Sequence, residues 1–158
     1  MKFLLPSEYQ FKAAELFNQL RTKLVTELPF AQIEHVGSSA IKGALSKGDL
    51  DIFVGVPQSE FSGSLDKLKS MGFSIKEDTL QTAALCMLVS STYDFDVAIQ
   101  LVELGSEFES FLEFRDQLNS NPELVTQYNR LKEESSSLTP EQYRVKKSAF
   151  IKMILEKP

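Results

Sequence analysis

The chain has 158 residues, of which 42% are hydrophobic and 25% charged, values that are ordinary for one soluble globular domain. Its formal net charge of −5 makes a long nucleic acid an unfavourable partner, because affinity for a phosphate backbone comes mostly from clustered Lys and Arg. One Cys and one His are too few for a zinc site, and no apolar run is long enough to cross a bilayer. We therefore expect a cytoplasmic protein with no membrane partner.

The first predicted element is an amphipathic helix from Ser7 to Glu27. Its apolar residues recur at intervals of three and four, and Ser7 follows Pro6 as a natural N-cap. Pro29 ends the helix and leads into a short apolar strand at 33–36. We expect the helix to pack on one face of the sheet that contains this strand.

The predicted strand at 33–36 ends in Gly37 and Ser38, which together favour a phosphate-binding turn. Glycine allows backbone N–H groups to approach a phosphate closely, and the serine hydroxyl can donate a further hydrogen bond. A short helix is predicted at 40–46 after this turn. Lys42 and Lys47 are exposed candidates for a phosphate contact, although surface lysines are common.

The next predicted strand begins with two carboxylates, Asp49 and Asp51. Side chains alternate along a strand, so this pair shares one face while Leu50 and Ile52 take the other. Like charges at this spacing are tolerated when they share a proton or bind a cation, and hard carboxylate oxygens suit Mg²⁺ or Mn²⁺. We expect the first helix to cover the sheet face opposite these aspartates.

The middle of the chain contains a predicted helix at 58–71 and strands at 73–76, 82–90 and 95–102, the last two joined by a hairpin. Asp96 begins the last strand and shares a face with Ala98 and Gln100. Asp96, a carboxylate in an otherwise apolar strand, can be interpreted in two ways: as a third catalytic carboxylate, or as an aspartate at a solvent-exposed strand end. His35 is likewise either a ligand contact or a hydrogen-bonded structural residue.

The remainder of the chain is predicted to be helical, at 106–119, 122–134 and 140–156. Ser106, Asn121 and Thr139 are the expected N-caps, and proline at 122 and at 140 occupies the first position of a helix. Some basic residues in these helices lie near aromatics and are candidates to face a phosphate or an acceptor: Arg115, Lys132, Arg144 and Lys147. The alternative is that they form a solvated face.

The order apolar-Gly-Ser, ten further residues, then Asp-apolar-Asp-apolar resembles the signature of the nucleotidyltransferase superfamily, as in DNA polymerase beta. Within it, GluHisValGlySer followed by GlyAlaLeuSerLysGlyAspLeuAsp is most similar to the GrpB family. The similarity continues through PheArgAspGlnLeu and TyrArgValLysLysSerAlaPheIle, so it covers the chain from about residue 33 to the end. Lys47 matches a lysine that is usual in that family, whereas the histidines found near the places of Ala98 and Gln100 are absent.

The resemblance implies an α+β fold: a mixed twisted sheet with flanking helices and a C-terminal helical segment, in one domain over 1–158 with its core at 30–102 and C-terminal helices at 106–156. It implies a site for Mg²⁺ or Mn²⁺ held by Asp49, Asp51 and a third carboxylate, for which Asp96 is the candidate. It also implies that Gly37 and Ser38 hold the phosphates of the nucleotide. The predicted nucleotide-binding residues are these two with Ser39, Lys47 and Lys147, the last because Tyr143 lies one helical turn before it. The expected substrate is an NTP, with ATP as first choice, and the expected reaction transfers its nucleoside monophosphate to an unknown acceptor.

Two other functions fit the same residues. One is a non-catalytic nucleotide-binding or regulatory module with the same fold, favoured if Asp96 lies far from the other two aspartates. The other is an interaction protein in which Gly37 and Ser38 form only a tight turn, favoured if neither metal nor nucleotide changes the melting temperature.

Overall fold

A computed structural model describes residues 2–156, and its centre is one five-stranded sheet with the strand order β1-β2-β5-β4-β3. The strands are β1 (Gln32–Val36), β2 (Asp49–Val56), β3 (Ser74–Ile75), β4 (Leu85–Ser90) and β5 (Asp96–Glu103). The two central strands β2 and β5 are parallel, and every other neighbouring pair is antiparallel. The predicted mixed sheet is therefore confirmed.

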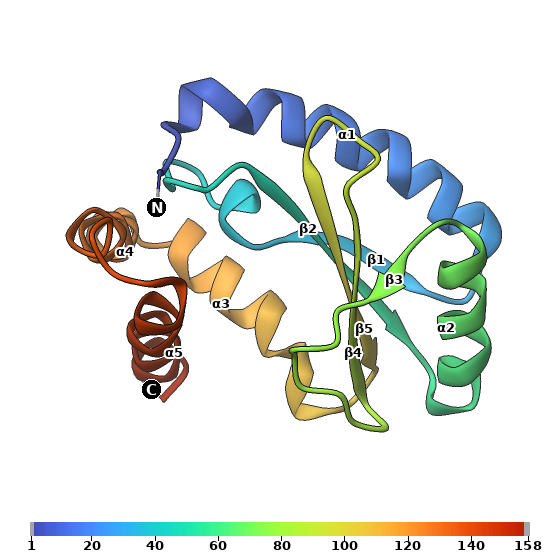
Figure 1. The fold of residues 1–158 in the computed structure, drawn as a ribbon. Coiled ribbons are helices and arrows are strands. Elements are labelled where there is room, and N and C mark those ends of the chain that lie inside the picture. The colour runs from blue at the N-terminus through green and yellow to red at the C-terminus, as the bar shows by residue number, and fades with distance from the viewer. Residues whose placement is uncertain (1, 157–158) are drawn as a thin grey trace.

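Helices lie on both sides of this sheet (Figure 1). They are α1 (Pro6–Glu27), α2 (Phe61–Ser70), α3 (Ser110–Asn119), α4 (Pro122–Glu134) and α5 (Pro140–Glu156), with single 3-10 turns at η1 (Ser38–Ala40), η2 (Gln58–Glu60) and η3 (Glu107–Glu109). In Figure 1, α1 runs along one side of the strands and α3 along the other, while α4 and α5 lie together at one end.

The two faces of the sheet have different partners. Leu50, Ile52 and Val54 of β2 point to the face that α1 and α2 cover, where Leu20 and Leu24 are fully buried in the same core cluster. On the opposite face, Phe53 packs in a smaller cluster with residues of η3 and α3. Since Asp49 and Asp51 alternate with Leu50 and Ile52, they lie on the face opposite α1, as the sequence predicted.

Some local predictions were wrong at the residue level. Helix α1 begins at Pro6 with Leu5 as its N-cap, so Ser7 lies inside the first turn, and the Glu8 carboxylate at the third helical position accepts a hydrogen bond from the Leu5 N–H at 2.8 Å. The predicted helix at 40–46 is absent: one 3-10 turn at Ser38–Ala40 is followed by turns. The predicted caps Asn121 and Thr139 do accept hydrogen bonds from the first turns of α4 and α5. Ser106 caps the 3-10 turn η3, and α3 begins later than predicted, at Ser110.

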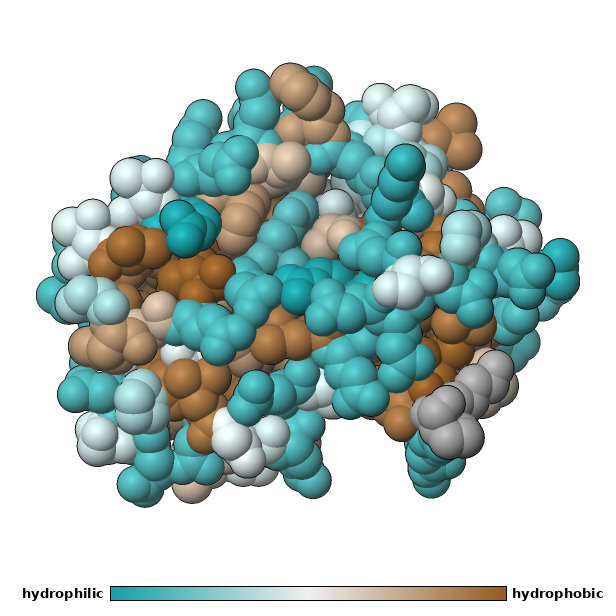
Figure 2. Space-filling model, turned by 180° about the vertical axis from the view of Figure 1, so that it is seen from behind, coloured by the Kyte–Doolittle hydropathy of each residue, from teal (hydrophilic) through white to brown (hydrophobic). Residues whose placement is uncertain are grey.

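The surface seen from behind is hydrophilic across its middle, and apolar residues gather towards its two ends (Figure 2). A few large apolar side chains are exposed, of which Phe11 at 75% and Val145 at 71% are the most accessible. Within residues 2–156, no helix combines the length and the hydrophobicity that a membrane span needs.

Candidate active site

The site is built around the turn that follows β1. Gly37 has φ = 74°, a backbone conformation that side-chain-bearing residues rarely adopt, and it leads into the 3-10 turn at Ser38–Ala40. A Cβ at position 37 would collide with the carboxylate of Asp51. Glycine is therefore required here both for its φ and because the Asp51 side chain lies directly against the turn.

Asp49 and Asp51 lie half-buried at the start of β2, beside this turn. The Ser46 hydroxyl donates to Asp49 Oδ1 at 3.3 Å and accepts from the Gly48 N–H at 3.0 Å. Burial and the negative charge of Asp49 raise the pKa of Asp51 to about 6, while Lys147, Lys132 and Lys47 act in the opposite direction. The pair is thus crowded, as the sequence predicted, and is compensated in part by lysines.

Lys132 of α4 is the most deeply buried of these lysines, with 1% of its surface exposed. Its ammonium group donates to Ser38 Oγ at 2.6 Å and to the Leu45 carbonyl, and it lies 3.9 Å from the centre of the Tyr128 ring. Burial, followed by repulsion from Lys147, lowers its pKa to about 6, although both aspartates oppose this shift. The side chain thus holds a titratable amine beside the Gly37 turn.

Lys147 and Lys47 complete the basic side of the site. Lys147 is half-buried on α5, and the electrostatic effect of Tyr128, with smaller contributions from Tyr143 and the two aspartates, raises its pKa. Lys47 is exposed and lies 5.6 Å from the centre of the Tyr143 ring. Lys42 is also exposed, and its backbone N–H donates to the Asn119 side chain.

The two serines of the turn have different roles. Ser38 is half-buried and contacts Lys132, with the Tyr128 hydroxyl 3.4 Å away. Ser39 is only 7% exposed, and its hydroxyl lies 2.7 Å from His35 Nε2. His35 also stacks on Phe17, and burial followed by the nearby Arg115 charge lowers its pKa to about 4. His35 is therefore a neutral, hydrogen-bonded structural residue.

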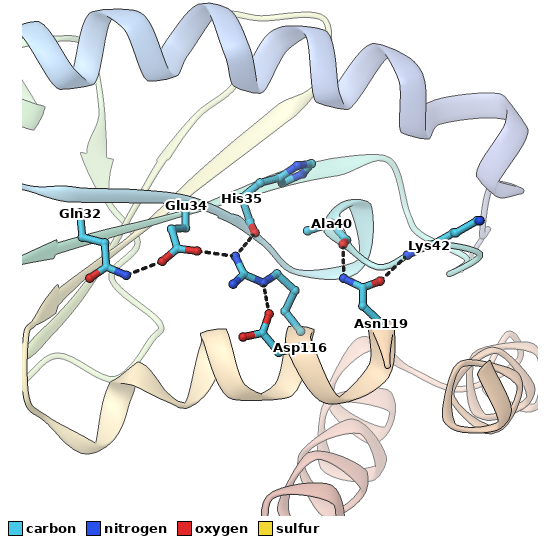
Figure 3. Close-up of polar contacts among 8 residues, drawn as sticks. Gln32, Glu34, His35, Ala40, Lys42, Asp116 and Asn119 are labelled. Carbon is cyan, nitrogen blue, oxygen red and sulfur yellow. Dashed lines mark hydrogen bonds and ion pairs between the residues drawn. The ribbon is translucent and has the colours of Figure 1, made fainter. Parts of the chain in front are cut away.

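Side chains from the surrounding helices fix the loop between β1 and β2. Asn129 of α4 accepts from the Leu45 N–H and donates to the Gly43 carbonyl, both at 2.8 Å. Tyr9 of α1 donates to the Ala44 carbonyl at 2.8 Å. Asn119, at the end of α3, donates to the Ala40 carbonyl and accepts from the Lys42 N–H (Figure 3). The loop is thus held in place by side chains that are distant in sequence.

Arg115 of α3 holds β1 in the same way. Its guanidinium donates to the His35 carbonyl at 3.0 Å and forms ion pairs with Glu34 and Asp116, both at 2.9 Å (Figure 3). Because these partners satisfy its charge on the outer edge of β1, Arg115 is committed to positioning that strand. Sequence reasoning had placed it among the possible phosphate contacts.

Asp96 lies on the strand next to the aspartate pair. It is the first residue of β5 and is the direct partner of Asp49 in the parallel β2–β5 register, so the two share a sheet face. Its side chain is exposed, in contrast to the half-buried Asp49 and Asp51. Within residues 2–156, no three His, Cys, Asp or Glu side chains lie close enough together to hold a metal ion.

The two hollows that stand out on the surface lie elsewhere. One, of about 920 Å³, follows α3 and is lined by Glu109, Glu113 and Asp116 among others, and one of about 400 Å³ lies between α1 and Tyr93. Neither is lined by Asp49 or Asp51, where the charged and hydrogen-bonding groups described above converge.

Sequence reasoning missed the aromatic and amide residues that build the site. Tyr9, Tyr128 and Tyr143 are 1–4% exposed. Tyr128 and Tyr143 lie beside the lysines, and Tyr9 and Asn129 fix the loop. Tyr128 stacks on Phe150 and meets Phe114 edge-on. The signal available in the sequence was the spacing of Tyr128, Asn129 and Lys132, since residues three and four apart share one face of a helix.

Comparison with solved structures identifies the class of fold. The poly(U) polymerase Cid1 with bound MgATP aligns over 77% of this chain and 40% of its own, with a TM-score of 0.53 and 21% identity. The crystal structure of the conserved protein GrpB from Enterococcus faecalis aligns over 97% of this chain and 94% of its own, with a TM-score of 0.78 and 22% identity. The fold is therefore nucleotidyltransferase-like.

The family is shown at the sequence level. The model of the GrpB protein family matches residues 6–157, and the chain belongs to this family. A UPF0157 protein of Vibrio cholerae is 48% identical over 155 residues, which are 98% of this chain and 82% of that protein. A UPF0157 protein of Deinococcus radiodurans is 28% identical over 147 residues, which are 91% of this chain and 76% of that protein.

Proposed function

We propose that this protein is a Mg²⁺-dependent nucleotidyltransferase that transfers a nucleoside monophosphate from an NTP, with ATP as first choice, to a hydroxyl acceptor. The observation that carries the proposal is the convergence of Asp49 and Asp51 with the Gly37 turn and the buried Lys132. These groups come from three separate elements, β2, the β1–β2 loop and α4, and a fold of the nucleotidyltransferase type supports the same reading.

The donor set fits a hard divalent cation. Asp49 and Asp51 offer carboxylate oxygens, which Mg²⁺ and Mn²⁺ prefer, and Asp51 has a raised pKa because its negative charge is poorly solvated. Nucleotide phosphates and water would supply the remaining ligands, with Asp96 as the proposed third carboxylate because of its register with Asp49. When bound, the ion supplies Lewis-acid stabilisation of the phosphoryl group and activates the attacking hydroxyl.

The chain's own residues would bind the triphosphate on the side of the Gly37 turn. Backbone N–H groups of the turn and the Ser38 hydroxyl can donate to phosphate oxygens. Lys132, Lys147 and Lys47 surround the aspartates with three basic groups against two carboxylates. A phosphate beside Lys132 would favour its charged form and reverse the lowering of its pKa. We therefore add Lys132 to the proposed nucleotide-binding residues Gly37, Ser38, Ser39, Lys47 and Lys147.

A non-catalytic nucleotide-binding module is the second candidate. The observation that favours it is that the described residues contain no three-carboxylate group close enough to hold a metal. Binding of MgATP without transfer would be its signature.

The experiment that separates the two follows α-labelled ATP, incubated with Mg²⁺ and an extract of small metabolites. The proposal predicts labelled products together with pyrophosphate, both lost in an Asp49→Asn/Asp51→Asn double variant and retained in Asp94→Asn, a matched change in the exposed hairpin. Nucleotide binding with no pyrophosphate release would favour the module. No binding at all would contradict both candidates.

A further inference from the structure

We infer that Ser46 is a positioning residue for the proposed transfer: its hydroxyl orients the carboxylate of Asp49 toward the divalent cation. This inference rests on the proposed function, because it takes Asp49 as a ligand of that cation. Three observations carry it: the hydrogen bonds of the Ser46 hydroxyl, the contacts that fix its backbone, and the burial of the residue.

The Ser46 hydroxyl links the end of the β1–β2 loop to the first residue of β2. It donates to Asp49 Oδ1 at 3.3 Å and accepts from the Gly48 N–H at 3.0 Å. A serine oxygen that accepts from the N–H two residues later forms a compact local turn. Because Gly48 directly precedes Asp49, this turn keeps the hydroxyl close to the carboxylate.

The single proton of this hydroxyl has two acceptors within reach, Asp49 Oδ1 and the Tyr9 oxygen. A charged acceptor forms a hydrogen bond about twice as strong as a neutral one, so the carboxylate is the preferred partner. Tyr9 donates its own proton to the Ala44 carbonyl at 2.8 Å. The contact from Ser46 therefore engages one oxygen of Asp49 and leaves Oδ2 to face a cation.

The backbone and the surroundings of Ser46 keep its hydroxyl in this place. Leu4, ahead of α1, forms an isolated antiparallel bridge with Ser46. The Leu4 N–H donates to the Ser46 carbonyl at 2.6 Å, and the Ser46 N–H donates to the Leu4 carbonyl at 3.2 Å. Ser46 is 2% exposed, so water does not readily replace Asp49 as the partner of its hydroxyl. The hydroxyl is thus oriented before a cation arrives.

An orienting contact matters at this position because the two aspartates repel each other. Asp49 and Asp51 share one face of β2, and their repulsion favours an Asp49 side chain that turns away from Asp51 when no cation is present. A hydrogen bond from a buried neighbour opposes this rotation, so less conformational freedom is lost when the cation binds. Changing the outer partner of a metal ligand typically lowers metal affinity by about 10–100-fold.

The test measures Mn²⁺ affinity by electron paramagnetic resonance, with a non-hydrolysable ATP analogue, in a double-mutant cycle of Ser46→Ala and Asp49→Ala. We expect Ser46→Ala to weaken Mn²⁺ binding by about tenfold and to cause no further loss in the Asp49→Ala background. The matched control is Ser64→Ala, which alters a fully buried serine of α2 and should bind Mn²⁺ as the wild type does. Melting temperatures check that each variant folds.

A second readout separates the orientation of Asp49 from a loosened loop. Hydrogen exchange at the Leu45 amide, which donates to Asn129, reports on the loop itself, and we expect the same rate in Ser46→Ala and in the wild type. Faster exchange together with weaker Mn²⁺ binding, or an equal loss of affinity in both backgrounds, would overturn the inference, because Ser46 would then act only through the fold.

Two further outcomes separate this inference from the proposed function. Unchanged Mn²⁺ affinity in Ser46→Ala, with a loss in Asp49→Ala, would overturn the role of Ser46 while the proposed function stands. If the wild type with the ATP analogue holds no more Mn²⁺ than the analogue alone, the proposed function fails, and the role of Ser46 fails with it.

Discussion

At the scale of single residues, the contact between Gly37 and Asp51 connects the turn to the carboxylate pair. The glycine turn would be interpreted from sequence alone as a phosphate cradle, and a backbone N–H can still have that role. In the structure its first effect is to make room for the Asp51 carboxylate, since a Cβ at position 37 would overlap it. The Asp51 carboxylate can therefore keep its position on β2 only because residue 37, after the neighbouring strand β1, has no side chain.

Replacing Gly37 with Ala tests this coupling. An alanine at position 37 would have to keep φ = 74° and ψ = −173°, a conformation that costs a residue with a Cβ about 1–3 kcal/mol, and its methyl group would displace Asp51. Gly72→Ala is the matched control, because Gly72 has φ = 100° and open space where its Cβ would be. We expect urea unfolding to show a larger loss for Gly37→Ala and calorimetry to show loss of MgATP binding in that variant alone. Equal losses in both variants would mean that backbone strain explains the effect.

At the scale of elements, the loop between β1 and β2 owes its conformation to helices that are far away in sequence. Asn129 of α4 pairs with Gly43 and Leu45 of the loop through both halves of its amide. Lys132, one helical turn later, reaches Ser38 and the Leu45 carbonyl. The C-terminal helices therefore belong to the candidate site, because the Gly37 turn and the loop before Asp49 are held by their side chains.

Asn129→Ala should loosen this loop. Losing one acceptor and one donor at partly buried positions is expected to cost about 1–3 kcal/mol and to speed hydrogen exchange at the Leu45 amide. Asn129→Asp keeps the acceptor for Leu45 and loses the donor for Gly43, so its effect should be intermediate. Gln127→Ala, at an exposed position of the same helix, should change neither quantity. Unchanged exchange at Leu45 in Asn129→Ala would show that the other contacts are sufficient.

The sequence was sufficient for predictions that rest on period and spacing. The alternation of Asp49, Leu50, Asp51 and Ile52 predicted which face the carboxylates share, and Pro122 and Pro140 marked where helices begin. It was insufficient where a contact joins residues about ninety positions apart, as Lys132 and Ser38 do. Nothing local distinguishes a lysine on a solvated helix face from one that tertiary packing buries, so the sequence offered Lys132 and Arg115 as equal candidates although their surroundings in the structure differ.

At the scale of the whole molecule, charge is distributed unevenly around the proposed reaction centre. Basic side chains from α4, α5 and the β1–β2 loop lie beside the two aspartates, whereas the strands β4 and β5 contain Asp96 and Glu103 and no Lys or Arg. A triphosphate is attracted to the basic side, because charges of opposite sign attract over the short distances of a binding site. The net charge of −5 for the whole chain is therefore a poor guide to the local charge at this site.

The measurement that tests the central claim most directly is a Mn²⁺ titration followed by electron paramagnetic resonance, in the presence of a non-hydrolysable ATP analogue. Free Mn²⁺ gives a strong signal that broadens when the ion is held by protein and nucleotide together. We predict that wild type and Asp94→Asn deplete the free signal beyond what the nucleotide alone does, and that Asp49→Asn/Asp51→Asn does not. Equal depletion by wild type and the double variant would contradict the assignment of Asp49 and Asp51 as metal ligands.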